Sequence, residues 1–136
     1  MIAIRRLLPA DAIAFHTLRL AGLQDTPSAF GSSWEEEHDL PLATLQGRLA
    51  EQADRGVFGA FDGERLVGLV ALGRESMRKL QHKGMIWGMY VAPEARGQGV
   101  ARALMDQALA LARSVESLRQ VNLCVNAANG PALRLY

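Results

Sequence analysis

The residues best suited to chemistry lie between Arg96 and Ala101, in the sequence Arg-Gly-Gln-Gly-Val-Ala. They precede an alanine- and leucine-rich stretch with helical periodicity, and no Ser, Thr, Asp or Asn is present to cap that helix. The first amides of a helix need acceptors, and glycine lets a bulky anion come close to them. Arg96 adds a forked cation suited to phosphate oxygens. The segment predicts a pyrophosphate site, although two glycines fit a plain tight turn with hydrated amides equally well.

Two common nucleotide motifs are absent from this segment. A dinucleotide fingerprint requires glycine or alanine where Arg102 stands, and the sequence has no Gly-Lys-Ser/Thr for a phosphate-binding loop. Hydride transfer and phosphoryl transfer are therefore disfavoured.

The elements around the turn predict how it is positioned. Met85–Val91 is almost wholly apolar, as in a strand covered on both faces, and Gly88 within it indicates a bulge or a close backbone approach. A helix is expected from about Gln98 to Ser114, followed by an apolar strand at Gln120–Val125. The order strand, helix, strand predicts parallel pairing of the two strands.

The first half of the chain predicts mixed helices and strands. The expected elements are a strand at Ile2–Leu7, a helix capped by Asp11 and ending near Leu23, a loop at Gln24–Ser33 and a helical region to about Arg55. Asp62-Gly63 separates two β-prone runs, Val57–Phe61 and Leu66–Leu72, and predicts an antiparallel hairpin. The basic stretch Gly73–Lys83 is expected to be a solvated loop. One domain spanning 1–136 follows, an α/β sandwich.

Composition excludes several classes of partner. With 15 basic and 14 acidic residues the formal charge is +1, so neither nucleic acid nor an anionic membrane is an expected partner. No apolar run approaches about 18 residues, and a cytoplasmic protein is expected. The lone cysteine, Cys124, is interpreted as a small buried hydrophobe. No metal is predicted, because the three histidines are scattered without metal spacing: His16, His38 and His82.

The turn resembles the core signature of the GNAT superfamily of acetyl-CoA-dependent N-acetyltransferases, Arg/Gln-x-x-Gly-x-Gly/Ala. Arg96, Gly99 and Ala101 match it. The stretch from Asn129 to Tyr136 is similar to a later family motif, Asn-x-x-Ala-x-x-Leu-Tyr. The resemblance covers essentially the whole chain. It implies a mixed, mostly antiparallel sheet with a central parallel strand pair, flanked by helices. Because the family normally continues past the tyrosine, the resemblance also leads us to expect an incomplete domain that lacks the C-terminal strands.

The resemblance also implies site residues. Backbone groups at the end of the fourth strand would pair with the pantetheine arm of acetyl-CoA and polarise the thioester carbonyl, and Tyr136 would protonate the departing thiolate. The cofactor-binding set is Met89, Tyr90, Val91, Arg96, Gly97, Gln98, Gly99, Val100, Ala101 and Asn129. From the residues alone, the position before Gly130-Pro131 favours a helix cap for Asn129, and a tyrosine such as Tyr136 is more often a packing residue.

The acceptor side is less defined. Candidate bases are Glu35, Glu36, Glu37, Glu75 and Glu94. Glu36 is our choice for the base, although Ser33 and Glu36 also form a capping box, and its two acidic neighbours are interpreted as solvated first-turn residues. Phe30 and Trp34 either line an acceptor pocket or anchor the core.

The predicted function is acetyl transfer from acetyl-CoA to a primary amine of a small molecule or peptide, by direct attack in a ternary complex. A homodimer is common in the family and is an open alternative to a monomer. Two other functions stay open: a non-catalytic acyl-CoA-binding or sensor domain, and an interaction module whose turn holds no ligand.

Overall fold

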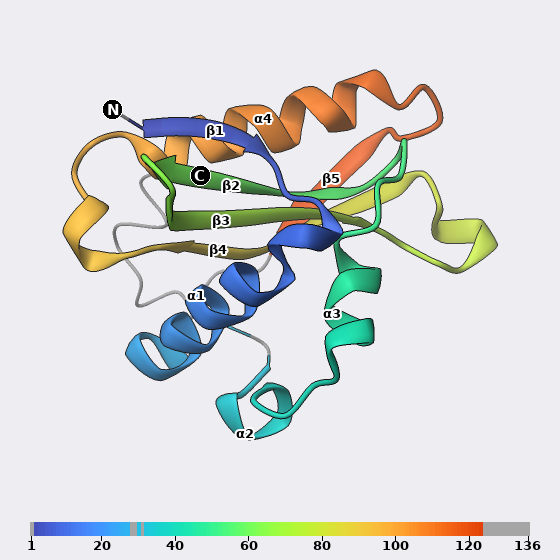
Figure 1. The fold of residues 1–136 in the computed structure, drawn as a ribbon. Coiled ribbons are helices and arrows are strands. Elements are labelled where there is room, and N and C mark those ends of the chain that lie inside the picture. The colour runs from blue at the N-terminus through green and yellow to red at the C-terminus, as the bar shows by residue number, and fades with distance from the viewer. Residues whose placement is uncertain (1, 28–29, 31, 124–136) are drawn as a thin grey trace.

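The computed structural model describes residues 2–27, 30 and 32–123 of the 136-residue chain, and these form one sheet with helices on both faces (Figure 1). The predicted site residues Asn129 and Tyr136, and the lone Cys124, lie outside the described residues.

The sheet has five described strands in the order β1-β2-β3-β4-β5. Their bounds are β1 Ile2–Arg6, β2 Gly56–Asp62, β3 Arg65–Arg74, β4 Lys83–Val91 and β5 Gln120–Leu123. Neighbouring strands are antiparallel from β1 to β4, and β4 and β5 are parallel, which confirms the mixed, mostly antiparallel sheet. The parallel pair comes last in the order of the described strands.

The helices lie in two layers. They are α1 Ala12–Asp25, α2 Trp34–Glu37, α3 Leu42–Arg48 and α4 Val100–Ser114. α4 covers one face of the sheet, mainly over β2 and β3, while α1 and α3 lie on the other face (Figure 1). The helical region expected before residue 55 is split into α2 and α3, because Pro41 lacks the amide that would continue a helix across it.

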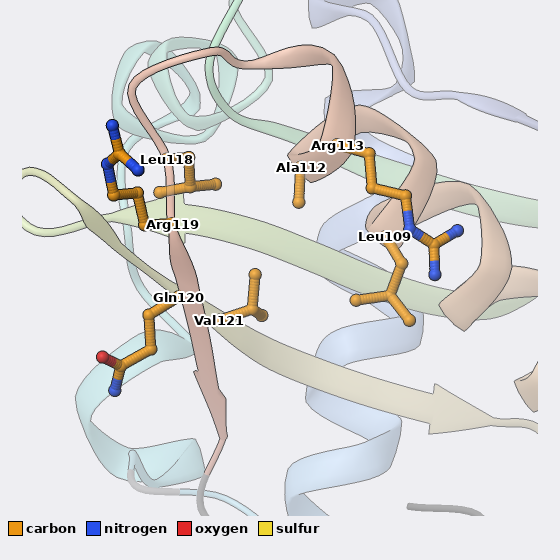
Figure 2. A pocket seen from close by; sticks show the side chains of 7 residues that line it. All are labelled: Leu109, Ala112, Arg113, Leu118, Arg119, Gln120 and Val121. Atoms are coloured by element: carbon orange, nitrogen blue, oxygen red, sulfur yellow. The ribbon is translucent and has the colours of Figure 1, made fainter.

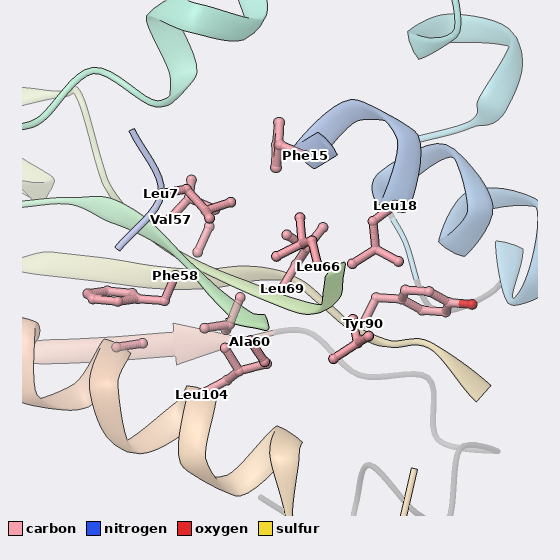
Figure 3. Packing of buried hydrophobic residues seen from close by; sticks show 14 of the residues in the cluster. Leu7, Phe15, Leu18, Val57, Phe58, Ala60, Leu66, Leu69, Tyr90 and Leu104 are labelled. Carbon is pink, nitrogen blue, oxygen red and sulfur yellow. The ribbon is translucent and has the colours of Figure 1, made fainter. Parts of the chain in front are cut away.

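The core occupies both faces of the sheet (Figure 3). Leu104 of α4 packs with Ala60 on one face, and Phe15 of α1 packs with Leu69 on the other, each at most 2% exposed. Strands buried on both faces explain the nearly unbroken apolar runs of β2 and β3. The central strands β2 and β3 are therefore held by packing on both faces.

Asp11 does not cap α1 as predicted. It occupies the N-cap position, but its carboxylate accepts the backbone N–H of Leu8 at 2.8 Å and two hydrogen bonds from Arg5 at 2.9 Å. These contacts close the preceding 3-10 turn, Pro9–Asp11. The side chain satisfies the turn before the helix, so it is unavailable to the helix itself.

The hairpin at Gly63 is confirmed, since Asp62 pairs with Arg65 across it. The solvated loop at Gly73–Lys83 is only partly correct, because β3 extends to Arg74 and β4 begins at Lys83. The Arg74 side chain is 13% exposed rather than solvated.

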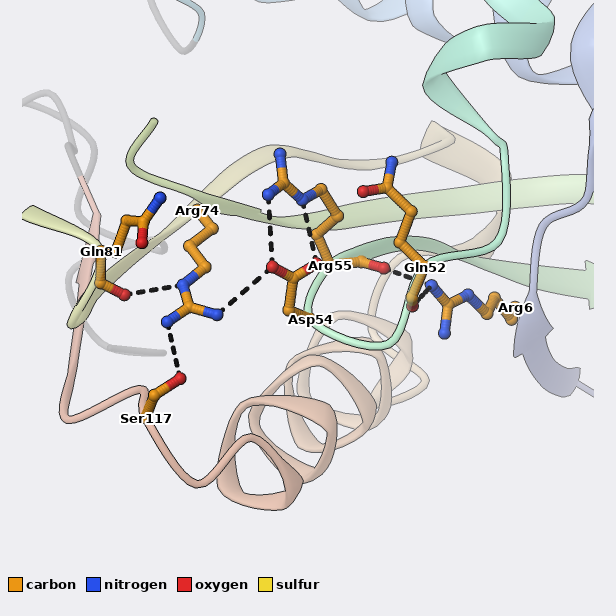
Figure 4. Close-up of polar contacts among 7 residues, drawn as sticks. All are labelled: Arg6, Gln52, Asp54, Arg55, Arg74, Gln81 and Ser117. Carbon is orange, nitrogen blue, oxygen red and sulfur yellow. Dashed lines mark hydrogen bonds and ion pairs between the residues drawn. The ribbon is translucent and has the colours of Figure 1, made fainter. Parts of the chain in front are cut away.

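Arg74 joins three connecting segments at one end of the sheet, those before β2, between β3 and β4, and between α4 and β5 (Figure 4). Its Nε donates to the Gln81 carbonyl at 2.6 Å, Nη1 to Asp54 at 3.3 Å and Nη2 to the Ser117 hydroxyl at 2.7 Å. The hydrogen bond from Arg55 lowers the pKa of Asp54. Nearby, Arg6 donates to the carbonyls of Gln52 and Arg55. Every guanidinium nitrogen of Arg74 therefore has an acceptor.

Among the described residues, no helix combines the length and the apolar character that crossing a membrane would require.

Candidate functional site

Strand β4 contains the predicted irregularity at Gly88. Tyr90 is paired with Leu69 of β3, whereas Trp87 is paired with Ala71, so β4 carries an extra residue between them. Gly88 has φ 70°, a left-handed conformation that a β-branched or bulky residue rarely adopts. Bulges of this kind re-aim the strand beside functional sites. The bulge is thus confirmed, immediately before the segment expected to bind the thioester.

The turn after β4 has two left-handed glycines. The 3-10 turn Pro93–Ala95 follows the strand, and then Gly97 has φ 79° and Gly99 φ 75°. Apart from its two chain neighbours, a Cβ added to either glycine would meet no atom of the described residues within 4 Å. Glycine is therefore required by backbone conformation, while the space outside the turn stays open to a ligand.

Helix α4 begins without a side-chain cap. It starts at Val100 rather than at the predicted Gln98, and its N-cap is Gly99, which has no side chain to offer. The first amide bonded across this end is that of Ala103, to the Gly99 carbonyl at 3.1 Å. No hydrogen bond joins the amides of residues 97–102 to another described residue. Such unsatisfied amides, at the positive end of a 15-residue helix, favour an anion.

The predicted residues of the turn are arranged around this end of α4. Val100 is 3% exposed and packs in the core, so it contributes through its backbone. Gln98 is exposed and Ala101 is half-buried. On β4, Tyr90 is buried while Met89 and Val91 are half-buried. The structure therefore brings the described members of the predicted cofactor set together, at the C-terminal end of β4.

The Arg96 side chain is directed away from the turn. Its Nε donates to the Val91 carbonyl at 3.0 Å and its Nη2 donates to Asp25 at 2.9 Å. Asp25 also accepts the Tyr90 hydroxyl at 2.9 Å, and these two hydrogen bonds lower the pKa of Asp25. Burial and the contact with Asp25 raise the pKa of Tyr90. Nε and Nη2 of Arg96 are thus engaged, whereas its side chain stays 48% exposed and the amides of residues 97–102 are unmatched among the described residues.

Asp25 is a residue that sequence reasoning missed. It closes α1 and fastens that helix to the end of β4 and to Arg96, which lie 65 and 71 residues further along the chain. A single aspartate at a helix end has no local pattern that could reveal such partners. Only the tertiary structure identifies it.

Glu36, the predicted base, lies exposed on α2. Its amide donates to the Ser33 hydroxyl at 3.2 Å, and that hydroxyl donates to the Glu36 carboxylate at 3.0 Å. Ser33 is therefore confirmed as the helix cap. A role for Glu36 as base stays a prediction.

Glu37 was expected to be solvated, and this is wrong. It is 4% exposed and accepts hydrogen bonds from Arg19 at 2.6 and 2.9 Å, with Arg48 at 3.4 Å. Burial raises the pKa of Glu37, but the hydrogen bonds from Arg19 and Ser32 and the charges of the two arginines outweigh it and lower the pKa to about 2. A carboxylate so strongly ionised is a poor proton acceptor near neutral pH.

Arg19 is the buried partner of Glu37, and its burial could have been predicted from the helical spacing of its neighbours. It lies four residues after Phe15 and three before Gly22, on the face of α1 that is buried. The side chains of Phe30 and Trp87 flank it, with ring centroids 5.5 and 5.2 Å from Cζ. Its Nη1 is buried and, among the described residues, has no hydrogen-bond partner. Leaving such a donor unpaired costs about 1–3 kcal/mol.

The two aromatic candidates behave differently. Phe30 is half-buried and contacts Tyr90, with 6.3 Å between ring centroids, so it lies beside the end of β4. Trp34 stacks instead on His38 of the next turn, with centroids 4.2 Å apart. Of the two, Phe30 is the one the structure brings to the site.

Comparison with known proteins decides the family. A model of the acetyltransferase (GNAT) family matches residues 20–136, which is most of the chain. The chain belongs to the GNAT acetyltransferase family. No curated protein matches it. As a member of this family, the chain is an acetyl-CoA-dependent N-acetyltransferase.

Solved structures share the fold of this GNAT chain. A GNAT acetyltransferase from Streptococcus pneumoniae is 19% identical, with a TM-score of 0.86 over 100% of this chain and 81% of that one. An aminoglycoside acetyltransferase from an uncultured soil metagenomic sample is 21% identical, with a TM-score of 0.77 over 100% and 88%. A predicted acetyltransferase from Clostridium acetobutylicum, solved with acetyl-CoA, is 17% identical, with a TM-score of 0.71 over 98% and 87%.

The acetyltransferase has a hollow that lies away from the glycine turn at residues 96–101. Its volume is about 190 Å³, and Figure 2 shows it between the C-terminal end of α4 and β5. The lining residues are Leu109, Ala112, Arg113, Leu118, Arg119, Gln120 and Val121. Gly99 lies 13 residues before Ala112, about 20 Å along the helix at 1.5 Å per residue.

In the described part of the GNAT chain, no group of three His, Cys, Asp or Glu residues could hold a metal.

Proposed function

We propose that this GNAT enzyme transfers the acetyl group directly from acetyl-CoA to a primary amine while both are bound. The observation that carries the proposal is the uncapped start of α4. Its amides are unsatisfied among the described residues, two left-handed glycines leave open space before it, and a bulged strand leads to it. These features fit a pyrophosphate at the helix end and an extended thioester arm beside β4.

The proposed roles divide between backbone and side chains. The amides from Gly97 to Ala101 bind the pyrophosphate, and Asn129 contacts the cofactor. The backbone of Met89–Val91 orients the pantetheine arm and polarises the acetyl carbonyl. Because these contacts use main-chain atoms, the side chains of β4 can pack in the core at the same time.

The proposed chemistry needs a neutral amine and a proton for the thiolate. The acceptor nitrogen bonds to the acetyl carbonyl carbon, the carbon–sulfur bond breaks, and Tyr136 donates a proton to the sulfur. The nitrogen loses one proton to Glu36 or to water. Glu37 is excluded from that role because its pKa is held at about 2.

Binding of acetyl-CoA is the first test of the proposal. Isothermal titration of the protein with acetyl-CoA, with NADH and ATP as controls, is expected to give saturable binding to acetyl-CoA alone. Thiol release is then followed with a panel of small-molecule and peptide amines. If acetyl-CoA binds tightly but no amine causes release of the CoA thiol, the acetyl-transfer proposal would give way to a non-catalytic acyl-CoA-binding function.

Substitution of Tyr136 by Phe tests the proton donor. We expect kcat to fall about a hundredfold, the usual scale for one general acid, while acetyl-CoA affinity stays within about twofold. Steady-state rates and calorimetric titrations provide the two values. An equal loss of affinity and turnover would assign Tyr136 a packing role instead.

A further inference from the structure

Arg19 is the one buried side chain whose donor is left unmatched in the described part of the chain. Its Nε and Nη2 both donate to Glu37, at 2.6 and 2.9 Å, yet Nη1 has no acceptor although it is shielded from solvent. Arg19 as a whole is 7% exposed. Buried polar atoms in native proteins nearly always have hydrogen-bond partners, so the unpartnered Nη1 of Arg19 indicates that an acceptor from outside the described residues binds there.

The charges around Arg19 leave an excess of one positive unit. Glu37 is shared by two guanidinium groups, because Arg48 also approaches it at 3.4 Å. One carboxylate therefore faces two cations, one of them almost wholly desolvated. A second anion brought to Nη1 would balance the charge and supply the missing acceptor.

Nη1 points at the bulge of β4. A Cβ built on Gly88 would lie 3.1 Å from Nη1, so a side chain at this position would press against the unmatched donor, and glycine avoids that contact. Gly88 directly precedes Met89–Val91, the segment proposed to hold the thioester. Phe30 and Trp87 flank the guanidinium with their rings. A group bound to Nη1 would thus lie beside the reacting end of acetyl-CoA.

We propose that Nη1 of Arg19 binds a carboxylate of the acceptor, so that the acceptor is an amine that also carries a carboxylate, of the amino-acid type. A planar, singly charged group suits one free nitrogen better than a phosphate, which would need more donors than are present. The apolar part of the acceptor would contact Phe30 and Trp87. Because Nη1 is shielded from solvent, a neighbouring side chain must turn aside to admit the carboxylate, and the half-buried Phe30 ring, 5.5 Å from Cζ of Arg19, is the side chain we assign to this movement.

This inference rests on the proposed transfer to a primary amine and narrows its acceptor. Matched probes test it: L-phenylalanine, L-methionine and L-glutamate, each beside its α-carboxamide, which keeps the amine and side chain and removes one carboxylate charge. Thiol release gives kcat/KM for each probe. A charged hydrogen bond predicts at least about a tenfold preference for one or more acids over their amides.

The variant is the double substitution Arg19→Met with Glu37→Met, because removing Arg19 alone would leave a buried unpaired carboxylate and could prevent folding. We expect the acid-over-amide preference to disappear, while kcat/KM for the amides and affinity for acetyl-CoA change less than about threefold. The control is Arg48→Met, which removes the other cation on Glu37, leaves Nη1 in place and is expected to keep the preference.

The outcomes separate this inference from the proposed function. If the protein binds acetyl-CoA and acetylates amines but treats acids and amides alike, or if the double variant keeps the preference, the carboxylate site is overturned and transfer stands. If acetyl-CoA does not bind, the proposed function fails, and calorimetric titration of the same pairs into the protein alone decides the carboxylate site. A loss of acetyl-CoA affinity in the double variant beyond about tenfold would assign Arg19 to the cofactor and overturn the proposal.

Discussion

The two ends of the sheet each contain a mostly buried arginine, and the two are satisfied to different degrees. At the end where β3 meets β4, Arg74 places all three guanidinium nitrogens on acceptors from Asp54, Gln81 and Ser117. At the end where β4 meets α4, Arg19 leaves Nη1 without one, and the amides before α4 are unmatched among the described residues. Polar groups therefore satisfy one another at one end of the sheet, whereas the other end keeps donors that are unmatched among the described residues.

This difference indicates which end of the sheet is suited to binding a ligand. A satisfied network rigidifies the segments that it joins, whereas unmatched donors destabilise the free protein until a ligand completes them. The same strand, β4, runs from one end to the other. It carries regular pairing near Arg74 and the bulge at Gly88 near the site.

The largest expected effect is at the open end, with Gly99→Glu. The carboxylate would meet the pyrophosphate and repel it, so we expect acetyl-CoA affinity to fall about a thousandfold, roughly 4 kcal/mol. Calorimetric titration measures it. The control is Gly63→Glu, since Gly63 has a similar φ of 64° and no neighbour within 4 Å, yet lies in the hairpin. Affinity that survives in Gly99→Glu would contradict an anion site at the turn.

The next effect concerns Glu37, the satisfied carboxylate beside the orphaned Nη1. Because its pKa is lowered to about 2, it stabilises the fold above its ordinary pKa near 4.5, and this contribution is lost as the pH falls from about 4.5 to 2. In Glu37→Gln the acid-induced loss of unfolding free energy should shrink by about 3 kcal/mol. Urea unfolding at several pH values measures it. Glu36→Gln, an exposed neighbour on α2, should leave the pH profile unchanged, and an equal change there would remove the special role of Glu37.

The smallest effect is expected at the closed end, with Arg74→Met. Losing three hydrogen bonds to a side chain that is 13% exposed should lower the unfolding free energy by about 1–2 kcal/mol, while acetyl-CoA affinity stays within about twofold. Thermal unfolding and calorimetric titration measure the two. Arg78→Met, an exposed residue in the same connection, serves as the matched control. A tenfold loss of affinity in Arg74→Met would show that the two ends are coupled.

Much of the fold could be predicted because its signals are local. The Asp62-Gly63 pair marks a turn, unbroken apolar runs mark buried strands, and the glycines at 97 and 99 mark a turn that needs positive φ. Each of these depends on residues close together in sequence. Asp11 shows the limit of such rules. Its carboxylate could accept a hydrogen bond either from the first turn of α1 or from the turn before that helix, and it accepts the one from Leu8 in the preceding turn.

The sequence by itself determined the elements, their order and the turn that marks the family, because periodicity and backbone preference are properties of short segments. The tertiary structure decided the partners: Asp25 with Tyr90 and Arg96, and Arg19 with Glu37. Charge pairing depends on which side chains meet after folding, and residues from 18 to 71 positions apart are brought together here. That is why the carboxylate of Glu37, expected in solvent, is buried, and why Arg96 has an aspartate partner that the sequence did not indicate.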